Sequence, residues 1–311
     1  MSFPSYIEIY KKGELEKRVL KSFEYLKKCI LCPRGCKVNR YENEKGECKV
    51  GRFAIVSSFG PHFGEEPPLV GRRGSGTVFF SGCNLHCVYC QNYEISQLLE
   101  GKEIDPFTLA EIFLEVERMG CHNLNLVSPT HVVPQILEAL FIAIPKGFRL
   151  PIVYNTGGYD SLITLKLLDG IVDIYMPDIK YSDSEKGKKY SDVKSYFEVS
   201  KKAVKEMHRQ VGDLIIENGI AKRGLLIRHL VLPNRLAGSF EILNFIAKEI
   251  SLNSYINIMD QYRPCYKAYS FKELSRRITK EEYEEVVKYA EKLGFKRGIP
   301  FEYDRNRWFL W

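Results

Sequence analysis

The sequence predicts an α/β fold, a partial (β/α)6 barrel of parallel strands preceded by a Cys-rich N-terminal lobe. Three observations lead to this prediction. Short apolar runs of strand length recur between residues 77 and 261, amphipathic segments separate them, and most cysteines lie before or just after the first run. Strands that alternate with helices pair in parallel through right-handed crossovers. A doubly wound sheet would share this pattern, but the length and order of the units favour a barrel.

The predicted strands are short and mostly apolar, as expected of a parallel sheet that is covered by helices. They comprise residues 77–82, 123–128, 152–156, 171–179, 225–232 and 255–261. Two of the helices between or after them carry a start signal. Thr108 with Glu111 fits a capping box, and Thr279 with Glu282 fits another. Residues 239–250 form a further amphipathic helix.

We predict two domains, a lobe with a connecting loop over residues 1–76 and the barrel with a C-terminal extension over residues 77–311. Hydrophobic residues make up 45% of the chain and charged residues 27%, which is ordinary for a soluble protein. No apolar run approaches the roughly 20 residues of a membrane span. We therefore expect a cytoplasmic protein without a membrane partner, in which nine cysteines are more typical of metal ligands than of disulfides.

Three cysteines follow the first predicted strand directly. Cys83, Cys87 and Cys90 have the spacing CxxxCxxC. Three thiolates so close together can hold one face of a [4Fe–4S] cluster. Such a cluster ordinarily has four thiolate ligands, so with three of them one iron stays open to a small molecule. A structural zinc site would need a fourth ligand. His86 is the candidate, but its adjacency to Cys87 makes joint ligation of one ion awkward.

This loop resembles that of the radical S-adenosylmethionine (SAM) superfamily, and the resemblance covers residues 77 to about 265. Within the superfamily the chain is similar to pyruvate formate-lyase activating enzymes and their uncharacterised relatives. The resemblance implies a catalytic [4Fe–4S] cluster on the three cysteines, with SAM on the open iron. One electron then cleaves SAM to methionine and a 5′-deoxyadenosyl radical, which abstracts a hydrogen atom. A flavodoxin- or ferredoxin-type reductant is implied, and the substrate would be a glycyl radical enzyme or an unknown small molecule.

The resemblance also places cofactor-binding residues at the carboxyl ends of the strands. Residues 128–131 stand where many members have Gly-Gly-Glu-Pro, and His131 either replaces part of that function or caps the next helix. Asn155 stands where the activating enzymes have an acid. Asp178 and Lys180 share one strand face, either toward SAM or as a structural ion pair. The residues expected at the cofactor are Tyr89, Ser128, Thr130, Asn155, Thr156, Asp178, Lys180 and Arg228.

The N-terminal lobe contains a second cysteine group. Cys29, Cys32, Cys36 and Cys48 have the spacing CxxCxxxC-x11-C. Four thiolates suit either a structural zinc ion or a fully ligated second iron–sulfur cluster, and both alternatives stay open. The loop at residues 60–68 is rich in titratable groups, and a solvated turn is the favoured interpretation over a loop that touches the substrate.

Two other functional classes are compatible with parts of the sequence. A zinc-ribbon protein that binds nucleic acid would use the net charge of +5 on residues 1–50, which carry 12 Lys and Arg against 7 Asp and Glu. The chain lacks an interleaved aromatic and basic pattern, so we do not expect a nucleic-acid partner. An iron–sulfur electron carrier would need a fourth ligand beside Cys90, which the sequence nearby does not offer.

Overall fold

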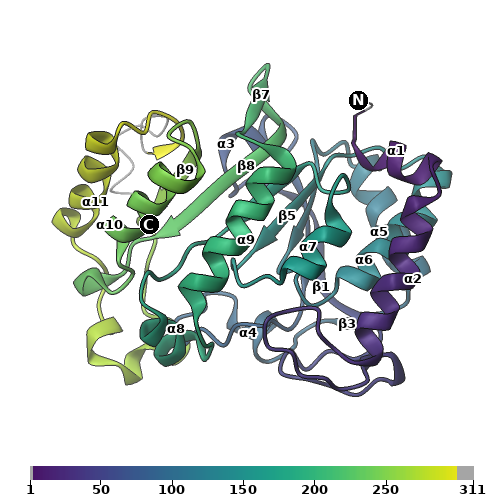
Figure 1. The fold of residues 1–311 in the computed structure, drawn as a ribbon, viewed down its shortest axis with the longest axis horizontal. Helices are drawn as coiled ribbons and strands as arrows, with labels where there is room; N and C mark the ends of the chain where they lie inside the picture. The colour runs from purple at the N-terminus through teal and green to yellow at the C-terminus, as the bar shows by residue number, and fades with distance from the viewer. Residues whose placement is uncertain (1–2, 300–311) are drawn as a thin grey trace.

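Six parallel strands form the centre of this computed structural model, which describes residues 3–299 (Figure 1). In spatial order they are β2 (Ser75–Phe80), β4 (Leu124–Val127), β5 (Ile152–Thr156), β6 (Ile174–Pro177), β8 (Ile220–Leu230) and β9 (Tyr255–Met259). Each overlaps one predicted strand. Among the described residues β2 and β9 do not pair with each other, so the barrel is open, and the predicted partial barrel is confirmed.

Three further strands pair antiparallel and were not predicted. β1 (Ala54–His62) pairs with β2, β3 (Lys102–Ile104) pairs with β1, and β7 (Ile215–Glu217) forms a hairpin with β8. β1 contains Gly60-Pro61, residue types that are depleted in strands. Because β3 pairs only with the start of β1, one side of β1 is an edge near Pro61, where proline is tolerated.

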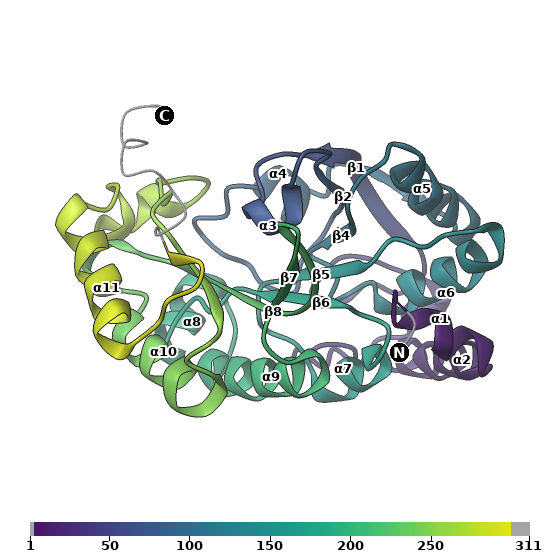
Figure 2. The ribbon, with the colours of Figure 1, turned by 90° about the horizontal axis from the view of Figure 1, so that it is seen from above.

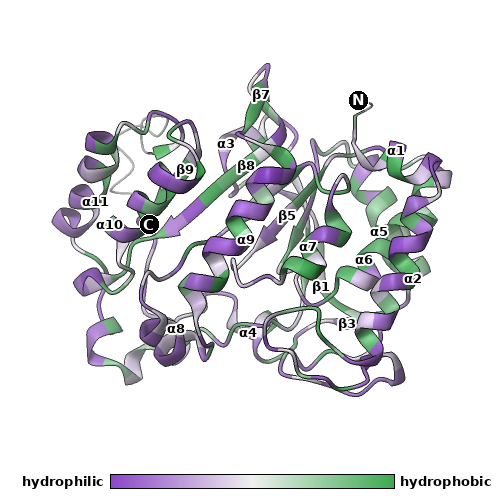
Figure 3. Ribbon diagram, in the orientation of Figure 1, coloured by the Kyte–Doolittle hydropathy of each residue, from purple (hydrophilic) through white to green (hydrophobic). Residues whose placement is uncertain are grey.

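Helices cover the outer face of the sheet, and Figure 2 shows α7, α9 and α10 in a curved row along it. The helices that follow the strands include α5 (Pro106–Arg118), α6 (Val133–Ala143), α7 (Leu162–Leu168), α9 (Tyr196–Val211), α10 (Ser239–Phe245) and α11 (Lys280–Leu293). The outward side chains of the strands pack against them in one large apolar core, and Figure 3 shows the central strands as largely hydrophobic. Within residues 3–299 no helix has the length and apolar character needed to span a membrane.

The two predicted capping boxes differ in outcome. At α11 the Thr279 side chain and Glu282 cap the first turn reciprocally, as predicted. At α5 the Thr108 capping box was wrong. Asp105 caps that helix, because its carboxylate accepts hydrogen bonds from the backbone N–H groups of residues 107 and 108, and Pro106 occupies the first helical position.

The N-terminal segment packs on the barrel through α1 (Tyr6–Lys11) and α2 (Glu14–Lys27), the latter beside α6. Tyr6 is fully buried and donates a hydrogen bond to the carbonyl of Leu150, while Ser5 donates to Asp173. Together with β1, these contacts join residues 3–76 closely to the barrel. The domain boundary at residue 76 stays a prediction, and residues 300–311 of the predicted extension lie outside the described residues.

The inside of the barrel has an apolar floor. A short helix, α3 (Pro67–Val70), inserts Leu69 among inward side chains near the amino ends of the strands, such as Val153, Ile174 and Leu226. Toward the carboxyl ends the inward residues become polar, and Figure 3 shows the carboxyl end of β8 as hydrophilic. In parallel barrels this end carries the active site.

Candidate active site

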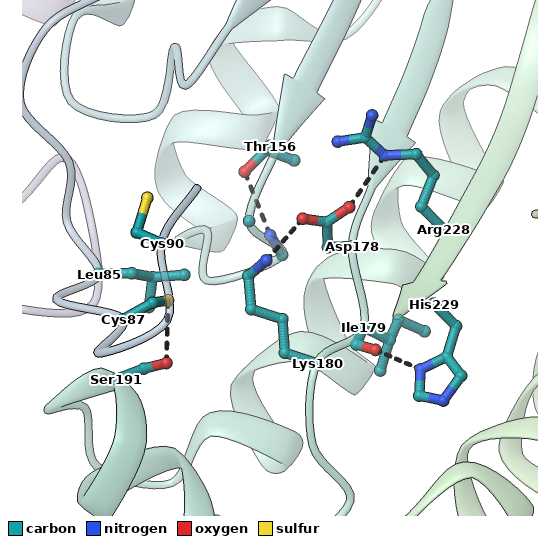
Figure 4. Close-up of polar contacts among 12 residues, drawn as sticks. Leu85, Cys87, Cys90, Thr156, Asp178, Ile179, Lys180, Ser191, Arg228 and His229 are labelled. Carbon is teal, nitrogen blue, oxygen red and sulfur yellow. Dashed lines mark hydrogen bonds and ion pairs between the residues drawn. The ribbon is translucent and has the colours of Figure 1, made fainter. Parts of the chain in front are cut away.

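The three-cysteine loop leaves β2 and is fixed by its backbone against α8 (Ser184–Ser191). The N–H of Val88 donates to the carbonyl of Tyr190 at 2.8 Å, and the N–H of His86 donates to that of Ser191 at 3.0 Å. The Sγ of Cys87 lies 3.0 Å from the Ser191 hydroxyl, a contact drawn in Figure 4. On the other side of the loop, Cys90 Sγ lies 3.2 Å from the Ser96 hydroxyl of α4 (Tyr93–Ser96). The loop is therefore anchored on both sides.

The spacing of these sulfurs suits a cluster better than a single ion. Within residues 3–299, three metal-ligating side chains lie within 4.8 Å of one another only at Glu47, His86 and Asp192, so Cys83, Cys87 and Cys90 do not form so tight a set. A single zinc ion would hold its sulfurs about 2.3 Å from one centre, whereas in a cubane each thiolate binds a different iron. His86 does not complete a zinc site with these cysteines, because the set within residues 3–299 that contains it joins it to Glu47 and Asp192.

Burial keeps the free thiols of Cys83 and Cys87 neutral, because it raises the pKa of both. Burial raises the pKa of Cys83 to about 12, with a smaller contribution from Cys87, and burial also raises the pKa of Cys87. The positive charge of Lys180 acts in the opposite direction on both thiols. Such buried thiols need a metal to become thiolates, which fits three cluster ligands.

Two glycines after β5 allow the cluster loop to approach. A Cβ on Gly157 would lie 2.6 Å from Leu85, and a Cβ on Gly158 would lie 2.1 Å from the carbonyl oxygen of Asp178. Gly158 also has a φ of +75°, which other residues rarely adopt. A side chain at position 157 would press against the cysteine loop, and one at position 158 would collide with the backbone at the end of β6.

Four of the predicted cofactor-binding residues meet inside the barrel. Asp178 Oδ2 lies 2.6 Å from Lys180 Nζ, and its Oδ1 accepts a hydrogen bond from Arg228 Nε at 2.9 Å (Figure 4). Arg228 also donates from Nη2 to Asn155 Oδ1 at 2.7 Å. Asp178 and Arg228 form a bridge between the end of β6 and β8, so the parallel register itself brings these residues together.

These charged groups keep their charges despite burial. Burial alone would lower the pKa of Lys180, but Asp178 and Cys87 outweigh it, so the pKa is raised. Burial acts to raise the pKa of Asp178, but Arg228 and Lys180 outweigh it, so this pKa is lowered. In Figure 4 the Lys180 side chain extends between the cysteine loop and Asp178. A fixed ammonium group thus stands beside the three cysteines.

The side chains of Thr130 and Thr156 form hydrogen bonds with a buried carboxylate. Both hydroxyls donate to the carboxylate of the buried Asp160 at 2.7 Å, and they lie 3.0 Å from each other. The hydroxyl of Tyr154 also donates to Asp160, at 3.0 Å. This network ties the turns after β4 and β5 together, and whether Thr130 and Thr156 also contact SAM stays a prediction.

Two other predicted positions shape the same region. Ser128 adopts a left-handed backbone with a φ of +58°, and its N–H donates to the carbonyl of Asn155. Tyr89 is buried under the cysteine loop, with its ring in edge contact with Tyr181 and Tyr262. Whether Ser128 and Tyr89 contact SAM stays a prediction.

His131 does not cap the helix that follows it, and whether it replaces part of the SAM-binding function stays a prediction. It is buried with its Nε2 2.9 Å from the carbonyl of Ser81, and burial, reinforced by Arg40, lowers its pKa to about 3. The neutral imidazole therefore donates to the start of the cysteine loop. Helix α6 begins after Val132 without a side-chain cap, so the capping alternative is wrong.

The loop after β1 contributes two carboxylates that the sequence analysis assigned to a solvated turn. That interpretation was wrong, because Glu66 is 4% exposed and the Glu65 side chain 8% exposed. Glu65 Oε2 lies 3.5 Å from Arg228 Nη1, and Glu66 Oε1 accepts a hydrogen bond from Asn257 Nδ2 at 2.8 Å. Adjacent acids show no helix or strand periodicity, so no local signal marks them as buried.

We expect replacement of Glu65 by glutamine to alter the pH dependence of stability. Burial raises the pKa of Glu65 to about 7, against the opposing charge of Arg228. When the pKa of a carboxyl group is higher in the folded protein than in the unfolded chain, the group stabilises the fold fully at a pH below its pKa in the unfolded chain. This stabilisation is lost as the pH rises through the pKa of the group in the folded protein. Between pH 5 and 8 the wild-type free energy of unfolding should fall by up to about 3 kcal/mol relative to Glu65→Gln. Parallel pH dependences of the two proteins in denaturant titrations would contradict this.

The N-terminal lobe covers the cysteine loop. Arg34 Nε donates to the carbonyl of Asn84 at 2.9 Å, and a Cβ on Gly82 would lie only 2.6 Å from the carbonyl oxygen of Cys48. Burial raises the pKa of Cys32 to about 12, and the nearby Cys48, Cys29 and Cys36 add to this effect. The four cysteines of the lobe thus lie close together, next to the loop.

Comparison with known proteins shows which family the chain belongs to. The model of the family described as "Radical SAM superfamily" matches residues 77–221. An uncharacterised protein of Methanocaldococcus jannaschii is 36% identical over 296 residues, which cover 92% of this chain and 81% of the relative. The chain belongs to the radical SAM superfamily. The predicted resemblance is confirmed, and membership implies the iron–sulfur and SAM chemistry of the superfamily.

Two more distant radical SAM relatives mark the limits of the comparison. The "Putative glycyl-radical enzyme activating enzyme MJ1227" of M. jannaschii is 28% identical over 120 residues, which cover 36% of this chain and 48% of the relative. The crystal structure of a radical SAM methyltransferase from Sphaerobacter thermophilus has a TM-score of 0.50 at 10% identity, and the match covers 72% of this chain and 65% of that one. The structural likeness supports the fold only.

Proposed function

We propose that this radical SAM protein reductively cleaves SAM at a [4Fe–4S] cluster held by Cys83, Cys87 and Cys90. The observation that carries the proposal is the convergence of three anchored cysteines with the Asp178, Lys180 and Arg228 charges at the carboxyl end of one parallel sheet. When bound, the cluster and SAM supply the 5′-deoxyadenosyl radical for hydrogen abstraction. A zinc-ribbon protein or a simple electron carrier has no use for these inward charges.

The other residues of the site bind SAM and orient it. Arg228 and Lys180 supply two fixed positive charges, which suit the SAM carboxylate, while Asp178 and Asn155 hold them in place. Leu85 and the Gly157-Gly158 turn set how closely the cysteine loop approaches the strand ends. Because these charges are paired in advance, binding of SAM requires little reorganisation of the barrel.

The test is anaerobic reconstitution with iron and sulfide, reduction with dithionite in the presence of SAM, and chromatography of the products. The proposal predicts equal amounts of 5′-deoxyadenosine and methionine. Protein that holds a reduced [4Fe–4S] cluster and binds SAM, yet releases neither product with or without candidate substrates, would contradict it.

The finer assignment within the superfamily is activation of a glycyl radical enzyme. It is supported by the partial match to the named activating enzyme, and by the Met-Pro-Asp-Ile-Lys segment at residues 176–180, which is similar to a Met-x-Asp-x-Lys segment of the activating enzymes. A small-molecule substrate is the alternative. A flavodoxin- or ferredoxin-type reductant would supply the electron, and the basic N-terminal lobe suits an acidic partner of this kind. We further propose a cytoplasmic location, where nine free cysteines stay reduced.

For the N-terminal lobe we propose a second metal centre on Cys29, Cys32, Cys36 and Cys48. The spacing of the sulfurs supports an iron–sulfur cluster over zinc in this proposal. No three of these sulfurs lie within 4.8 Å of one another, although a tetrahedral zinc ion with bonds of about 2.3 Å requires such proximity. The wider arrangement favours a second cluster, adjacent to the first through the contact of Arg34 with Asn84.

We expect Cys36→Ser to lower the iron content of reconstituted protein by about half, since two [4Fe–4S] clusters hold about eight irons. Cys36 is the most exposed of the four, so its replacement disturbs packing least. Iron, sulfide and zinc would be measured in Cys36→Ser and in Cys121→Ser, whose buried thiol belongs to neither cysteine group. Unchanged iron in Cys36→Ser together with one zinc per wild-type chain would favour the zinc alternative.

A further inference from the structure

A layer of polar side chains crosses the inside of the barrel between the apolar floor and the Asp178–Lys180 pair. It is formed by Glu65 and Glu66 from the loop after β1, Asn125 of β4 and Asn257 of β9. Arg228 connects this layer to the proposed SAM residues, because its guanidinium contacts both Glu65 and Asp178. A molecule in the layer would therefore lie next to the proposed SAM site.

Several atoms of this layer lack partners. Within residues 3–299, Glu66 Oε2 and both Oδ1 and Nδ2 of Asn125 are buried without a hydrogen bond shorter than 3.5 Å. Asn125 is 0% exposed, and its amide lies close enough to the Glu65 carboxyl to act on that group's pKa, but not within 3.5 Å of it. Unpaired buried polar atoms cost about 1–3 kcal/mol each, so such a group of them indicates a ligand. A carboxylate oxygen only accepts, so this ligand must present a hydrogen-bond donor to Glu66.

The charges of the region are unbalanced. Once Glu65 is ionised, above its pKa of about 7, three carboxyl groups, from Glu65, Glu66 and Asp178, face two fixed cations, Arg228 and Lys180. Both cations already contact Asp178. Among residues 3–299 Glu66 has a hydrogen bond from the neutral amide of Asn257 and shares the charge of Arg228 with Glu65 and Asp178. A buried carboxylate without a cation is costly, so the missing charge is positive.

We propose that the Glu65–Glu66 layer binds a cationic group, an ammonium or a guanidinium, of the molecule whose hydrogen atom is abstracted. The inference rests on the proposed function for the identity of the reaction, but not for the binding itself. It assigns the substrate to amines or guanidines, either as small molecules or as a Lys or Arg side chain of a peptide. The positive group would donate a hydrogen bond to Glu66 Oε2, and a neighbouring polar atom of the same ligand would form a hydrogen bond with the Asn125 amide.

The test compares four small probes of similar size on anaerobically reconstituted protein that is saturated with SAM: n-butylammonium, methylguanidinium, n-butanol and butyrate. Thermal unfolding is recorded with each probe at equal concentration. We expect the two cations to raise the apparent Tm by several degrees and the alcohol and the anion to leave it unchanged. In Glu66→Gln, and independently in Glu65→Gln, the effect of the cations should disappear. Glu103→Gln, which alters an exposed glutamate of β3, should retain it.

The possible results distinguish failure of the cation site from failure of the proposed function. Equal stabilisation by n-butanol, or by the cations in wild type and both glutamine variants, would overturn the proposal. Stabilisation by cations that is seen in SAM-free protein but not in SAM-saturated protein would also overturn it, because the layer would then serve SAM itself. Cation stabilisation that requires Glu66, in protein that fails to cleave SAM under reduction, would leave the cation site standing and reject only the proposed function.

Discussion

Replacement of Cys87 by serine is expected to abolish the release of 5′-deoxyadenosine from SAM, by more than about a hundredfold. Cys87 is the most deeply buried of the three loop cysteines, at 7% exposed, and a neutral serine hydroxyl is a poor ligand for iron at this place. The cluster would lose one of three protein ligands, so the variant should also contain less loop-bound iron. Product chromatography and iron analysis on the same preparations measure both effects.

The matched control is Cys121→Ser. Cys121 is 2% exposed, so this exchange also places a hydroxyl in a buried site, but its sulfur packs in the outer core away from the loop. Cys121→Ser should keep its iron and its activity even if its Tm falls slightly. If Cys87→Ser matched this control in 5′-deoxyadenosine yield, the three-cysteine loop would not hold the catalytic cluster.

The strands and the cysteine loop were predictable because their signals are local. Each parallel strand is a short apolar run, and Cys83, Cys87 and Cys90 stand within eight residues of one another. Asn155, Asp178 and Arg228 were predicted from the resemblance to radical SAM enzymes, which places such residues near the carboxyl ends of parallel strands, at one edge of a sheet. Their mutual hydrogen bonds at 2.7–2.9 Å follow from that register.

The remaining parts of the site depend on contacts between distant segments. Glu65 meets Arg228 across 163 positions of the chain, and nothing in the local sequence signals this contact. Thr130 and Thr156 stand at strand ends as expected, but Asp160, which the sequence analysis did not consider, accepts hydrogen bonds from both hydroxyls. β1 was missed because Gly60-Pro61 suggests a turn, whereas pairing with β2 overrides that preference.

The second large effect is expected for Arg228→Leu. The exchange keeps much of the side-chain volume, but it leaves Glu65 without its cation and Asp178 with Lys180 alone. Breaking a buried ion pair by removing one partner costs about 3–5 kcal/mol, because the other charge stays buried. Denaturant titration at pH 8 should show this loss, and SAM binding should weaken as well. Arg118→Leu, which removes an exposed partner of Glu115, should cost less than about 1 kcal/mol.

The loss in Arg228→Leu should depend on pH in a direction that identifies its cause. The pKa of Glu65, about 7 in wild type, is held down by Arg228, so removal of the guanidinium raises it further. At pH 6 Glu65 of the variant can be protonated, so the variant avoids most of the cost of a buried unpaired charge. At pH 8 the Glu65 carboxylate of the wild type is ionised and paired with Arg228, whereas the variant has no such pair. The difference in unfolding free energy between the two proteins should therefore grow from pH 6 to pH 8. A difference that is constant over this range would attribute the loss to packing at β8 rather than to the Glu65–Arg228 pair.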